Sequence, residues 1–390
     1  MTSLAFYTPV KHPYEAEPSG DRELGRLLMT ALRGLGFAPH LASRLLTYRR
    51  AFDPADAARV ERIAALTTTR LIGRYRRGEA VRRPRAWVTY QSYYRAPDLV
   101  GPTVATALAI PYILVDTYLS AKSRRTSFRP WVSAARVAVR RADLIFLMSP
   151  RDRPRVAAHR GPRFAAERIL DLPPAVDLGR FEASAARRAD CRRALAARFP
   201  AGDGPLILAV AAMREVKKLE PYRILADALA RLHAGAPTRP WRLAVVGDGP
   251  ARPAVAGAFG GLPAGRVAFL GSLEPEILPT AYFGADLFAF PGRFHVVYLQ
   301  AAAAGLPVVA CAGPEPDPMV APDGALLTEP TPDAFAAGVA RLLDDPDLRH
   351  TMGAAARRFV TADRTLETFQ HRLAAGFAVV GLSCARSTSR

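Results

Sequence analysis

Short apolar runs alternate with amphipathic, helix-patterned segments along most of this chain. The runs are rich in Val, Ile and Leu, as in Leu144 to Met148, Leu206 to Val210 and Leu243 to Val246. Segments with helical periodicity, such as Tyr222 to His233 and Ala334 to Leu343, separate them. Strands that are apolar on both faces and alternate with helices form parallel sheets covered by helices. The pattern therefore predicts an α/β fold of the doubly wound type.

A chain of 390 residues is too long for one ordinary core, so we expect two such domains in tandem. We predict a first domain over residues 1–180, a linker over 181–204, and a second domain over 205–363. Residues 364–390 are predicted to form a final helix and a polar tail. In the segment that precedes Trp87, Asp53 followed by Pro54 is typical of a helix start. We expect an exposed basic helix to begin there.

Basic residues are concentrated in the first half of the chain. The whole chain has 54 Lys and Arg against 35 Asp and Glu, and residues 1–200 hold 36 of the basic and 17 of the acidic residues. Arg outnumbers Lys 50 to 4, so a G+C-rich coding composition is one explanation. The other is an anionic membrane surface facing the first domain. A specific nucleic-acid partner is not expected, because no basic stripe is interleaved with stacking aromatic residues.

The cysteines and the chain start favour a cytoplasmic protein, either free or peripheral on the inner face of a membrane. Cys191, Cys311 and Cys384 are odd in number and lack metal-ligand spacing, which argues against a disulfide framework and a structural zinc site. The first residues lack the pattern of a secretory leader, and no apolar stretch approaches the roughly 18 residues of a membrane-spanning helix.

Ligands of open α/β sheets bind beyond the carboxyl ends of the strands, so chemistry is expected in the loops there. Ser19, Gly20 and Asp21 follow the first strand-like run and open a helix, which suits either a phosphate or hydroxyl site or a simple N-cap. A cluster of cations follows Leu206 to Ala212 and suits a diphosphate, with solvated surface charge as the alternative; it comprises Arg214, Lys217 and Lys218.

Three further segments lie at strand ends. Gly247 to Pro250 reads Gly-Asp-Gly-Pro but has Arg252 where a dinucleotide fingerprint needs its third glycine, so a tight strand-to-helix turn is favoured over NAD binding. Gly271 ends another run. Phe288 to Ala310 joins a strand, a loop, a helix of small residues and a second strand, and the small residues would let that helix lie close against a neighbour.

Taken in order, these segments resemble a family-4 retaining glycosyltransferase of the GT-B fold. The resemblance implies two Rossmann-like domains facing each other across a cleft, with the nucleotide sugar on the second domain and the acceptor on the first. It implies sugar transfer from a nucleoside-diphosphate donor with retention, and no metal or other cofactor. The acceptor would be a sugar, a lipid-linked molecule or another small molecule. The helix at about Arg364 to Ala378 would cross back to the first domain.

The resemblance also assigns roles to individual residues. Arg214 and Lys218 match the family's diphosphate-binding cations, which implies catalysis by stabilising the departing diphosphate, and Gly271 matches the backbone that approaches the base. The family's two glutamates, separated by seven residues, fall on Gly292 and Gln300. Gln300 could still bind ribose hydroxyls. A different register would put Arg293 or His295 in the donor pocket, although His295 is equally consistent with an ordinary loop residue.

Polar and aromatic residues follow two strand-like runs of the first domain and are candidates for the acceptor side. They are Tyr93, Tyr94 and Arg95 in one loop, and Asp116, Tyr118 and Lys122 in the other. Core tyrosines and surface charges would give the same pattern. The loss of both glutamates leaves a second interpretation open, a glycosyltransferase-like protein that binds a nucleotide or a partner without catalysing transfer.

Overall fold

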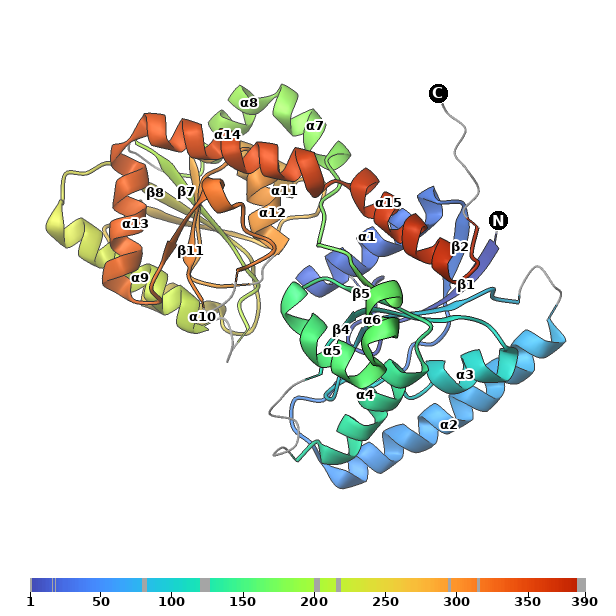
Figure 1. Cartoon of the computed structure of the whole chain (residues 1–390). Helices are drawn as coiled ribbons and strands as arrows, with labels where there is room; N and C mark the ends of the chain where they lie inside the picture. The colour runs from blue at the N-terminus through green and yellow to red at the C-terminus, as the bar shows by residue number, and fades with distance from the viewer. Residues whose placement is uncertain are drawn as a thin grey trace, which may run out of the picture. The chain divides into compact units, whose positions relative to one another are not determined.

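The chain forms two compact units in a computed structural model (Figure 1). The structure describes residues 2–15, 17, 19–78, 83–119, 127–199, 204–214, 219–293, 296–313 and 316–383. The first unit comprises Met1–Glu17, Asp21–Pro173 and Glu367–Arg390. The second comprises Pro18–Gly20 and Pro174–Leu366. Each unit contains one six-stranded sheet with helices on both faces, which confirms the predicted doubly wound α/β architecture.

The sheet of the first unit is parallel throughout and has the strand order β2-β1-β3-β4-β5-β6. Its strands are β1 (Thr2–Tyr7), β2 (Phe37–Leu41), β3 (Trp87–Ser92), β4 (Tyr112–Thr117), β5 (Leu144–Leu147) and β6 (Ile169–Asp171). Parallel strands with buried side chains on both faces need helices on both sides, and the helices provide this cover.

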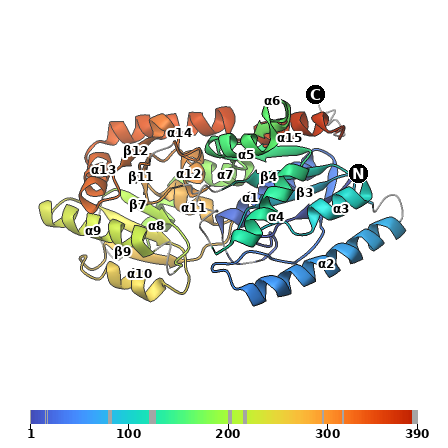
Figure 2. The ribbon, with the colours of Figure 1, turned by 60° about the horizontal axis from the view of Figure 1, so that its bottom comes forward.

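Five helices cover the two faces of this first sheet. α1 (Gly20–Gly34) and α15 (Leu366–Val379) lie on one face, and α2 (Pro54–Arg77), α3 (Gly101–Leu108) and α4 (Arg129–Arg141) lie on the other (Figures 1 and 2). The short segments η3 (Pro150–Asp152), α5 (Arg153–Arg160) and α6 (Pro162–Arg168) follow β5. The ring of Phe377 on α15 packs against Phe37 at 5.4 Å and Phe146 at 6.1 Å between centroids. The last helix is therefore part of the first unit's core.

The sheet of the second unit is also parallel, with the order β12-β11-β10-β7-β8-β9. Its strands are β7 (Leu206–Val210), β8 (Arg242–Val246), β9 (Val267–Gly271), β10 (Leu287–Ala289), β11 (Val308–Cys311) and β12 (Ala325–Thr328). One face carries α9 (Leu219–Gly235), α10 (Arg252–Ala258) and α13 (Pro332–Asp344). The other carries α7 (Gly179–Ala186), α8 (Arg188–Ala196), α11 (Leu278–Gly284), α12 (Val296–Ala303) and α14 (Pro346–Asp363), and η4 (Pro322–Gly324) precedes β12.

The division between the units falls at Pro173 and again at Leu366. Much of the segment that we expected to be a linker, residues 181–204, forms α7 and α8 of the second unit, because Phe181, Cys191 and Leu195 bury their side chains in its core. Val176 pairs with Thr365 in a short parallel bridge, so the entering and leaving segments of the second unit lie side by side.

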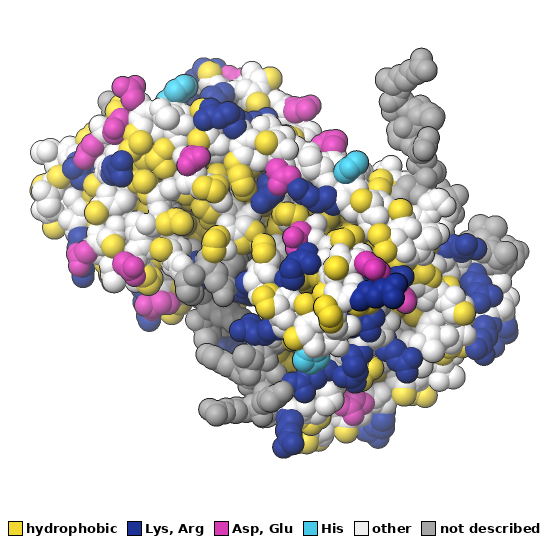
Figure 3. Space-filling model, viewed as in Figure 1, with side chains coloured by type: hydrophobic (Ala, Val, Ile, Leu, Met, Phe, Trp, Pro, Cys, Tyr) yellow, Lys and Arg dark blue, Asp and Glu magenta, His cyan; other side chains and the backbone are white. Residues whose placement is uncertain are grey.

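The exposed basic helix that we expected in the first domain is α2. The side chain of Asp53 accepts a hydrogen bond from the backbone N–H of Asp56, and Pro54 occupies the first turn. Val60, Ala64, Leu71 and other residues bury one stripe of the helix. The exposed side carries six arginines, namely Arg59, Arg62, Arg70, Arg74, Arg76 and Arg77. Figure 3 shows Lys and Arg side chains, in dark blue, gathered over the visible face of the first unit.

Candidate functional site

The strand order of the second sheet contains a topological switch point, which is the place where consecutive strands of the chain are added on opposite sides of the sheet. The chain runs from β7 through β8 to β9 on one side and then begins β10 on the other side of β7. The loops that follow β7 and β10 therefore diverge at one point of the carboxyl edge, where open α/β sheets bind ligands. Arg214 lies in the first of these loops, and Gly292 and Arg293 lie in the second. Three of the candidate residues thus lie in the two loops that flank this switch point.

The Gly-Asp-Gly-Pro segment after β8 supports the loop that carries Arg214. Gly247 and Gly249 have φ angles of 139° and 147°, in the region that favours glycine. A Cβ atom on Gly247 would lie 2.1 Å from the carbonyl oxygen of Ala211, and one on Gly249 would lie 2.5 Å from that of Met213. Met213 also donates its N–H to the carbonyl of Asp248 at 2.9 Å. The two glycines therefore allow close packing of this segment against the loop after β7, a contact that the prediction of a tight strand-to-helix turn did not include.

The other residues of this edge are only partly described. Arg214 is half-buried, and its N–H bonds to the carbonyl of Ala212. Gly271 has a φ of 70° and open space where a side chain would begin. The guanidinium of Arg293 lies against the backbone of Gly313, just beyond β11. Three of the predicted donor-site residues fall outside the described residues: Lys217, Lys218 and His295.

Gln300 lies inside the second unit, on the buried helix α12. Its side chain is 7% exposed, and its Oε1 accepts a hydrogen bond of 2.9 Å from the hydroxyl of Tyr282. Gly292, at the position of the other family glutamate, donates its N–H to the carbonyl of Phe290 at 2.8 Å. Neither position supplies a carboxylate, and the amide of Gln300 already has a protein partner.

Helix α12 is short, its small residues are confined to its C-terminal end, and two arginines close that end. Arg188 donates to the carbonyl of Ala304 at 2.6 Å, and Arg357 donates to the carbonyl of Ala303. The last carbonyls of a helix lack partners within the helix, and cations satisfy both their hydrogen bonding and the helix dipole. This arrangement fixes α12 beside the loop that follows β10.

A second switch point lies in the first sheet, between β1 and β3. Four polar side chains from the strand ends and the start of α1 meet there. Lys11 Nζ lies 2.7 Å from Asp21 Oδ2, and Gln91 Nε2 donates to Asp21 Oδ1 at 3.2 Å and to Asp116 Oδ2 at 3.1 Å. Asp21 and Asp116 were expected on the donor and acceptor sides respectively. The structure joins them through Gln91, which the sequence did not single out.

The backbone at two of these residues is strained. Gln91 has a φ of 60° and Asp116 a φ of 57°, both in the left-handed region that residues other than glycine rarely adopt. Such conformations persist where the surrounding structure imposes them, and they are concentrated at functional sites. Burial raises the pKa of the Asp116 carboxyl to about 6, although the hydrogen bond from Gln91 opposes this, and the neighbouring carboxylates of Asp152 and Asp21 raise it further.

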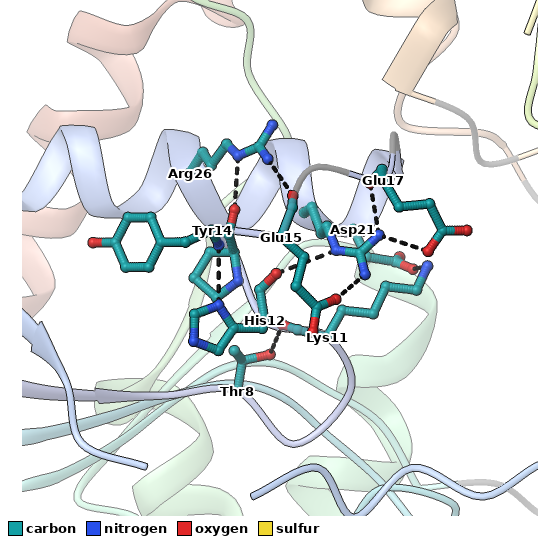
Figure 4. A network of polar contacts seen from close by, with 10 residues as sticks. Thr8, Lys11, His12, Tyr14, Glu15, Glu17, Asp21 and Arg26 are labelled. Carbon is teal, nitrogen blue, oxygen red and sulfur yellow. Dashed lines mark hydrogen bonds and ion pairs between the residues drawn. The ribbon is translucent and has the colours of Figure 1, made fainter. Parts of the chain in front are cut away.

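The loop between β1 and α1 is held in place by two arginines of α1. Arg22, which is 5% exposed, donates to the carbonyl oxygens of His12 and Glu17 and pairs with both Glu15 and Glu17. Arg26 donates to the carbonyls of Pro13 and Glu15, both at 2.7 Å. Figure 4 shows this network with Lys11 and Asp21 at one side of it. The arginines thereby fix the backbone between Lys11 and the start of α1.

The tyrosines that follow β3 and β4 pack together. The ring of Tyr93 stacks on that of Tyr118 with centroids 4.5 Å apart, and Tyr94 contacts Phe128 edge-on. The guanidinium of Arg95 lies 5.8 Å from the ring centroid of Tyr94. Lys122 lies outside the described residues, as do Pro18 and Cys384. Ser19 and Gly20 are described, with Gly20 the first residue of α1.

The described ranges contain neither a candidate metal site nor a candidate membrane span. No group of three or more His, Cys, Asp or Glu side chains there is arranged to hold a metal ion. None of the helices in those ranges combines the length and apolar character needed to cross a membrane.

Comparison with known proteins shows what the second unit is similar to. Residues 204–345 match the family model described as glycosyl transferases group 1. This part of the chain is therefore similar to the group 1 glycosyl transferases. It contains β7 to β12 and both loops at the switch point of the second sheet, including Arg214 and Arg293.

Curated relatives that match part of this chain are named as glycosyltransferases. One is the GDP-mannose-dependent alpha-(1-6)-phosphatidylinositol monomannoside mannosyltransferase of Mycolicibacterium smegmatis, 32% identical over 257 residues, or 62% of this chain and 64% of the relative. Another is the alpha-D-kanosaminyltransferase of Streptomyces kanamyceticus, 30% identical over 258 residues and 64% of each chain. The similarity thus spans less than two thirds of these relatives.

Solved structures extend the likeness to both units. The alpha,alpha-trehalose 6-phosphate synthase from Burkholderia multivorans superimposes with a TM-score of 0.72 over 100% of both chains, at 15% sequence identity. At that identity the comparison establishes the fold, which is GT-B. The predicted pair of Rossmann-like domains and the resemblance to group 1 glycosyltransferases are both confirmed.

Proposed function

We propose that this chain is a glycosyltransferase that moves a sugar from a nucleoside-diphosphate donor to a hydroxyl group of an acceptor, with retention at the anomeric carbon and no need for a metal ion. The observation that carries the proposal is the group 1 match over residues 204–345, which includes both loops at the switch point of the second sheet. Arg214 and Arg293 follow the two strands that flank this point.

The proposed catalysis is electrostatic. The nucleoside diphosphate leaves with a growing negative charge, and Arg214, with Lys217 and Lys218 next in sequence, would neutralise it as a metal ion does in other enzymes. Gly271, which has no atom within 4 Å of the place that a Cβ would take, remains the proposed contact to the base. Ser19, Gly20, Arg293 and His295 remain proposed donor contacts, as does Gln300 for the ribose.

We propose that the first unit binds the acceptor. Its switch point presents the polar side chains of Asp21, Gln91 and Asp116, and the stacked rings of Tyr93 and Tyr118 lie at the ends of the same strands β3 and β4. Aromatic faces and hydrogen-bonding groups are suited to polyhydroxylated molecules. The mannosyltransferase relative acts, by its name, on a phosphatidylinositol monomannoside, which makes a lipid-linked glycan the first acceptor class to test.

We also propose that α2 attaches the first unit to an anionic membrane surface. Ile63 and Leu66 are exposed by 39% and 59%, and Arg59, Arg62 and Arg70 lie three or four residues away on the same side of the helix. Exposed apolar side chains flanked by arginines are typical of helices that lie in a membrane interface.

The function is tested by binding and turnover. Nucleoside diphosphates and nucleotide sugars, beginning with GDP and GDP-mannose, should raise the melting temperature in the presence of EDTA. Arg214→Gln should weaken that binding roughly ten- to hundredfold, on the scale of one charge-assisted hydrogen bond. Arg223→Gln, at an exposed position of α9, is the matched control. Release of the nucleoside diphosphate from a bound sugar nucleotide shows catalysis, whereas binding without release would favour the nucleotide-binding alternative.

A further inference from the structure

We propose that His40 is a pH-sensitive anchor for the C-terminal turn of α2: the neutral imidazole holds this turn against the first sheet, and protonation loosens it. His40 lies on β2, which is the edge strand of that sheet, and the turn that it contacts comprises residues 74–77. The device lies within the first unit and does not depend on the proposed function.

The side chain of His40 lies on the face of the first sheet that α2 covers. Phe37, three residues earlier on β2, packs against α15 on the other face, and side chains along a strand alternate between the two faces. The imidazole of His40 meets the ring of Tyr75 edge-on, with centroids 5.8 Å apart. Tyr75 is 4% exposed and is the buried residue of the last turn of α2. The contact therefore joins the edge of the sheet to the end of the helix.

A chain of three hydrogen bonds requires the neutral imidazole. Arg74 Nη2 donates to the hydroxyl oxygen of Tyr75 at 3.1 Å, and that oxygen lies 2.8 Å from His40 Nε2. Because a guanidinium can only donate, the Tyr75 hydroxyl uses its own proton to donate to a bare Nε2. His40 Nδ1 then carries the ring proton and donates to Ser3 Oγ on β1 at 3.3 Å. Each group in the chain has a partner when His40 is uncharged.

A proton on His40 Nε2 breaks this chain at the Tyr75 hydroxyl. Two donors, the imidazolium and the guanidinium of Arg74, would then face one phenol oxygen, and the phenol proton would lose its acceptor. A buried polar group without a partner is unfavourable. The second positive charge would also lie near that of Arg74, whose guanidinium is 4.9 Å from the centroid of the Tyr75 ring. The contact between helix and sheet is therefore weakened in acid.

The groups around His40 oppose its protonation. Burial lowers the pKa of His40 below its ordinary value of 6.5, and the charge of Arg74 lowers it further. Tyr75 also comes from α2, and β1 contributes Ser3, which does not ionise. Arg85, before β3, bonds to Ser3 through its backbone and has an exposed side chain. None of the groups that shift this pKa is a carboxylate.

The sign of the pH dependence follows from this lowered pKa. The unfolded chain binds the proton of His40 more readily than the folded protein does, so the folded contact is fully stable above about pH 6.5. It weakens as the pH falls below that value. Histidine is the side chain whose ordinary pKa makes such a change possible near neutral pH.

The turn that His40 anchors carries three arginines, Arg74, Arg76 and Arg77. A second contact, from Arg76 Nη2 to the carbonyl of Ala107 at 3.0 Å, is on the exposed side of the helix. The ends of helices open more easily than their centres, because their last carbonyls lack partners within the helix. Loss of the buried contact of Tyr75 should therefore open this turn locally while the rest of the unit stays folded.

Hydrogen exchange at the backbone amides of residues 71–78 measures the opening of the turn. Between pH 7.5 and pH 5 the protection factor of the parent, corrected for the pH dependence of chemical exchange, should fall about tenfold, the scale of one buried hydrogen bond. Protection of α3, on the same face of the sheet, should stay constant. The midpoint of the fall should coincide with the pKa of the His40 ring, followed by NMR.

Four variants separate His40 from other causes of this pH dependence. His40→Gln keeps an acceptor for Tyr75 and does not ionise, so the turn should be equally protected at both pH values. Tyr75→Phe removes the hydrogen bond and should leave the turn poorly protected at both. Arg74→Gln removes a neighbouring positive charge, so the midpoint should move to higher pH. His350→Gln, at an exposed position of α14, is the matched control and should keep the parental pH dependence.

Equal protection of the parent at the two pH values overturns the proposal, as does a parental pH dependence in His40→Gln. A fall of the same size in α3 and in residues 71–78 indicates general loosening of the unit and overturns it as well. If His40→Gln does not fold, Tyr75→Phe decides the question, because a pH dependence that persists without the Tyr75 hydroxyl contradicts the anchor. Loss of the dependence in His40→Gln and its retention in His350→Gln support it.

Discussion

The hydroxyl of Tyr282 donates a hydrogen bond of 2.9 Å to Oε1 of Gln300, and both side chains are buried in the second unit. The two residues come from α11 and α12, so the bond ties together two helices on one face of the sheet. It places the residue that replaces a family glutamate in the protein's own hydrogen-bond network.

Replacement of Gln300 separates a structural role from a role in donor binding. Gln300→Ala removes the buried acceptor of the Tyr282 hydroxyl and should reduce the free energy of unfolding by about 1–3 kcal/mol. Tyr282→Phe is the matched control, because it removes the same hydrogen bond and keeps the Gln300 amide. Loss of nucleotide affinity in Gln300→Ala alone, measured by calorimetry, would support a ribose contact. Equal affinities in the two variants would contradict it.

The close approach of the loops after β7 and β8 predicts a strong effect of adding one methyl group. Gly249→Ala would place a Cβ atom 2.5 Å from the carbonyl oxygen of Met213 at a φ of 147°, so the loop that carries Arg214 must move. We expect a loss of several kcal/mol in stability and a weaker affinity for nucleoside diphosphates.

Gly257→Ala provides the control for this steric effect. It lies in α10 with no atom within 4 Å of the added Cβ, and alanine favours helix, so the variant should be stabilised by about 0.5–1 kcal/mol. Chemical denaturation of the three proteins measures the difference. Equal stability of Gly249→Ala and the parent would show that the two loops can separate at little cost.

The raised pKa of Asp116 makes a prediction about stability that does not depend on activity. Burial raises the pKa from 3.8 in the unfolded chain to about 6 in the folded protein, so between these values the folded state binds the extra proton. The stability contributed by this proton is complete below about pH 4 and is lost as the pH rises through 6. Asp116→Asn, which does not ionise, should therefore be more stable than the parent at pH 7, by roughly 1–3 kcal/mol.

Unfolding in urea at pH 4 and pH 7 measures this effect. The advantage of Asp116→Asn should be present at pH 7 and absent at pH 4. Asp323→Asn, at an exposed position of η4, is a control for the loss of one negative charge. An advantage for Asp116→Asn of the same size at both values would contradict the raised pKa.

Charge on α2 should control attachment to anionic vesicles. Replacement of Arg74, Arg76 and Arg77 by glutamine should weaken binding to vesicles that contain phosphatidylglycerol, by about 1 kcal/mol for each charge near the surface, and added salt should narrow the difference. Replacement of Arg223, Arg341 and Arg358, which are exposed in the second unit, is the matched control. Equal binding of the two triple variants in a sedimentation assay would assign the basic charge to composition rather than to a membrane surface.

The sequence predicted those strands that lie in the centre of a sheet and consist of one uninterrupted apolar run. Leu206 to Val210 was predicted as a strand and is β7, because a central parallel strand is apolar on both faces. β2 escaped notice because it contains Pro39 and His40, and it lies at the edge of its sheet, where proline is tolerated. The linker expected after residue 180 is helical because Phe181 and Leu195 have a core to enter, which periodicity alone does not reveal.

The candidate site was predictable only in part. The sequence placed Arg214 and Asp116 at strand ends, since cations and carboxylates after apolar runs are a local signal. Gln91 carries no such signal, because its importance arises from a left-handed backbone and from carboxylates 70 and 25 residues away. Tyr282 lies 18 residues before Gln300, and only the packing of α11 against α12 brings them together. Long-range pairings of this kind are what sequence patterns leave out.

The return of α15 to the first unit determines the order in which the protein can mature on the ribosome. Synthesis proceeds from the N-terminus, so residues 174–366 are complete before Phe377 can fill its place beside Phe37 and Phe146. Most of the first unit is therefore synthesised before the second unit, but its core is completed after the second unit has been synthesised. Until Leu366–Val379 have been synthesised, the apolar face of the first sheet that α15 covers is incomplete.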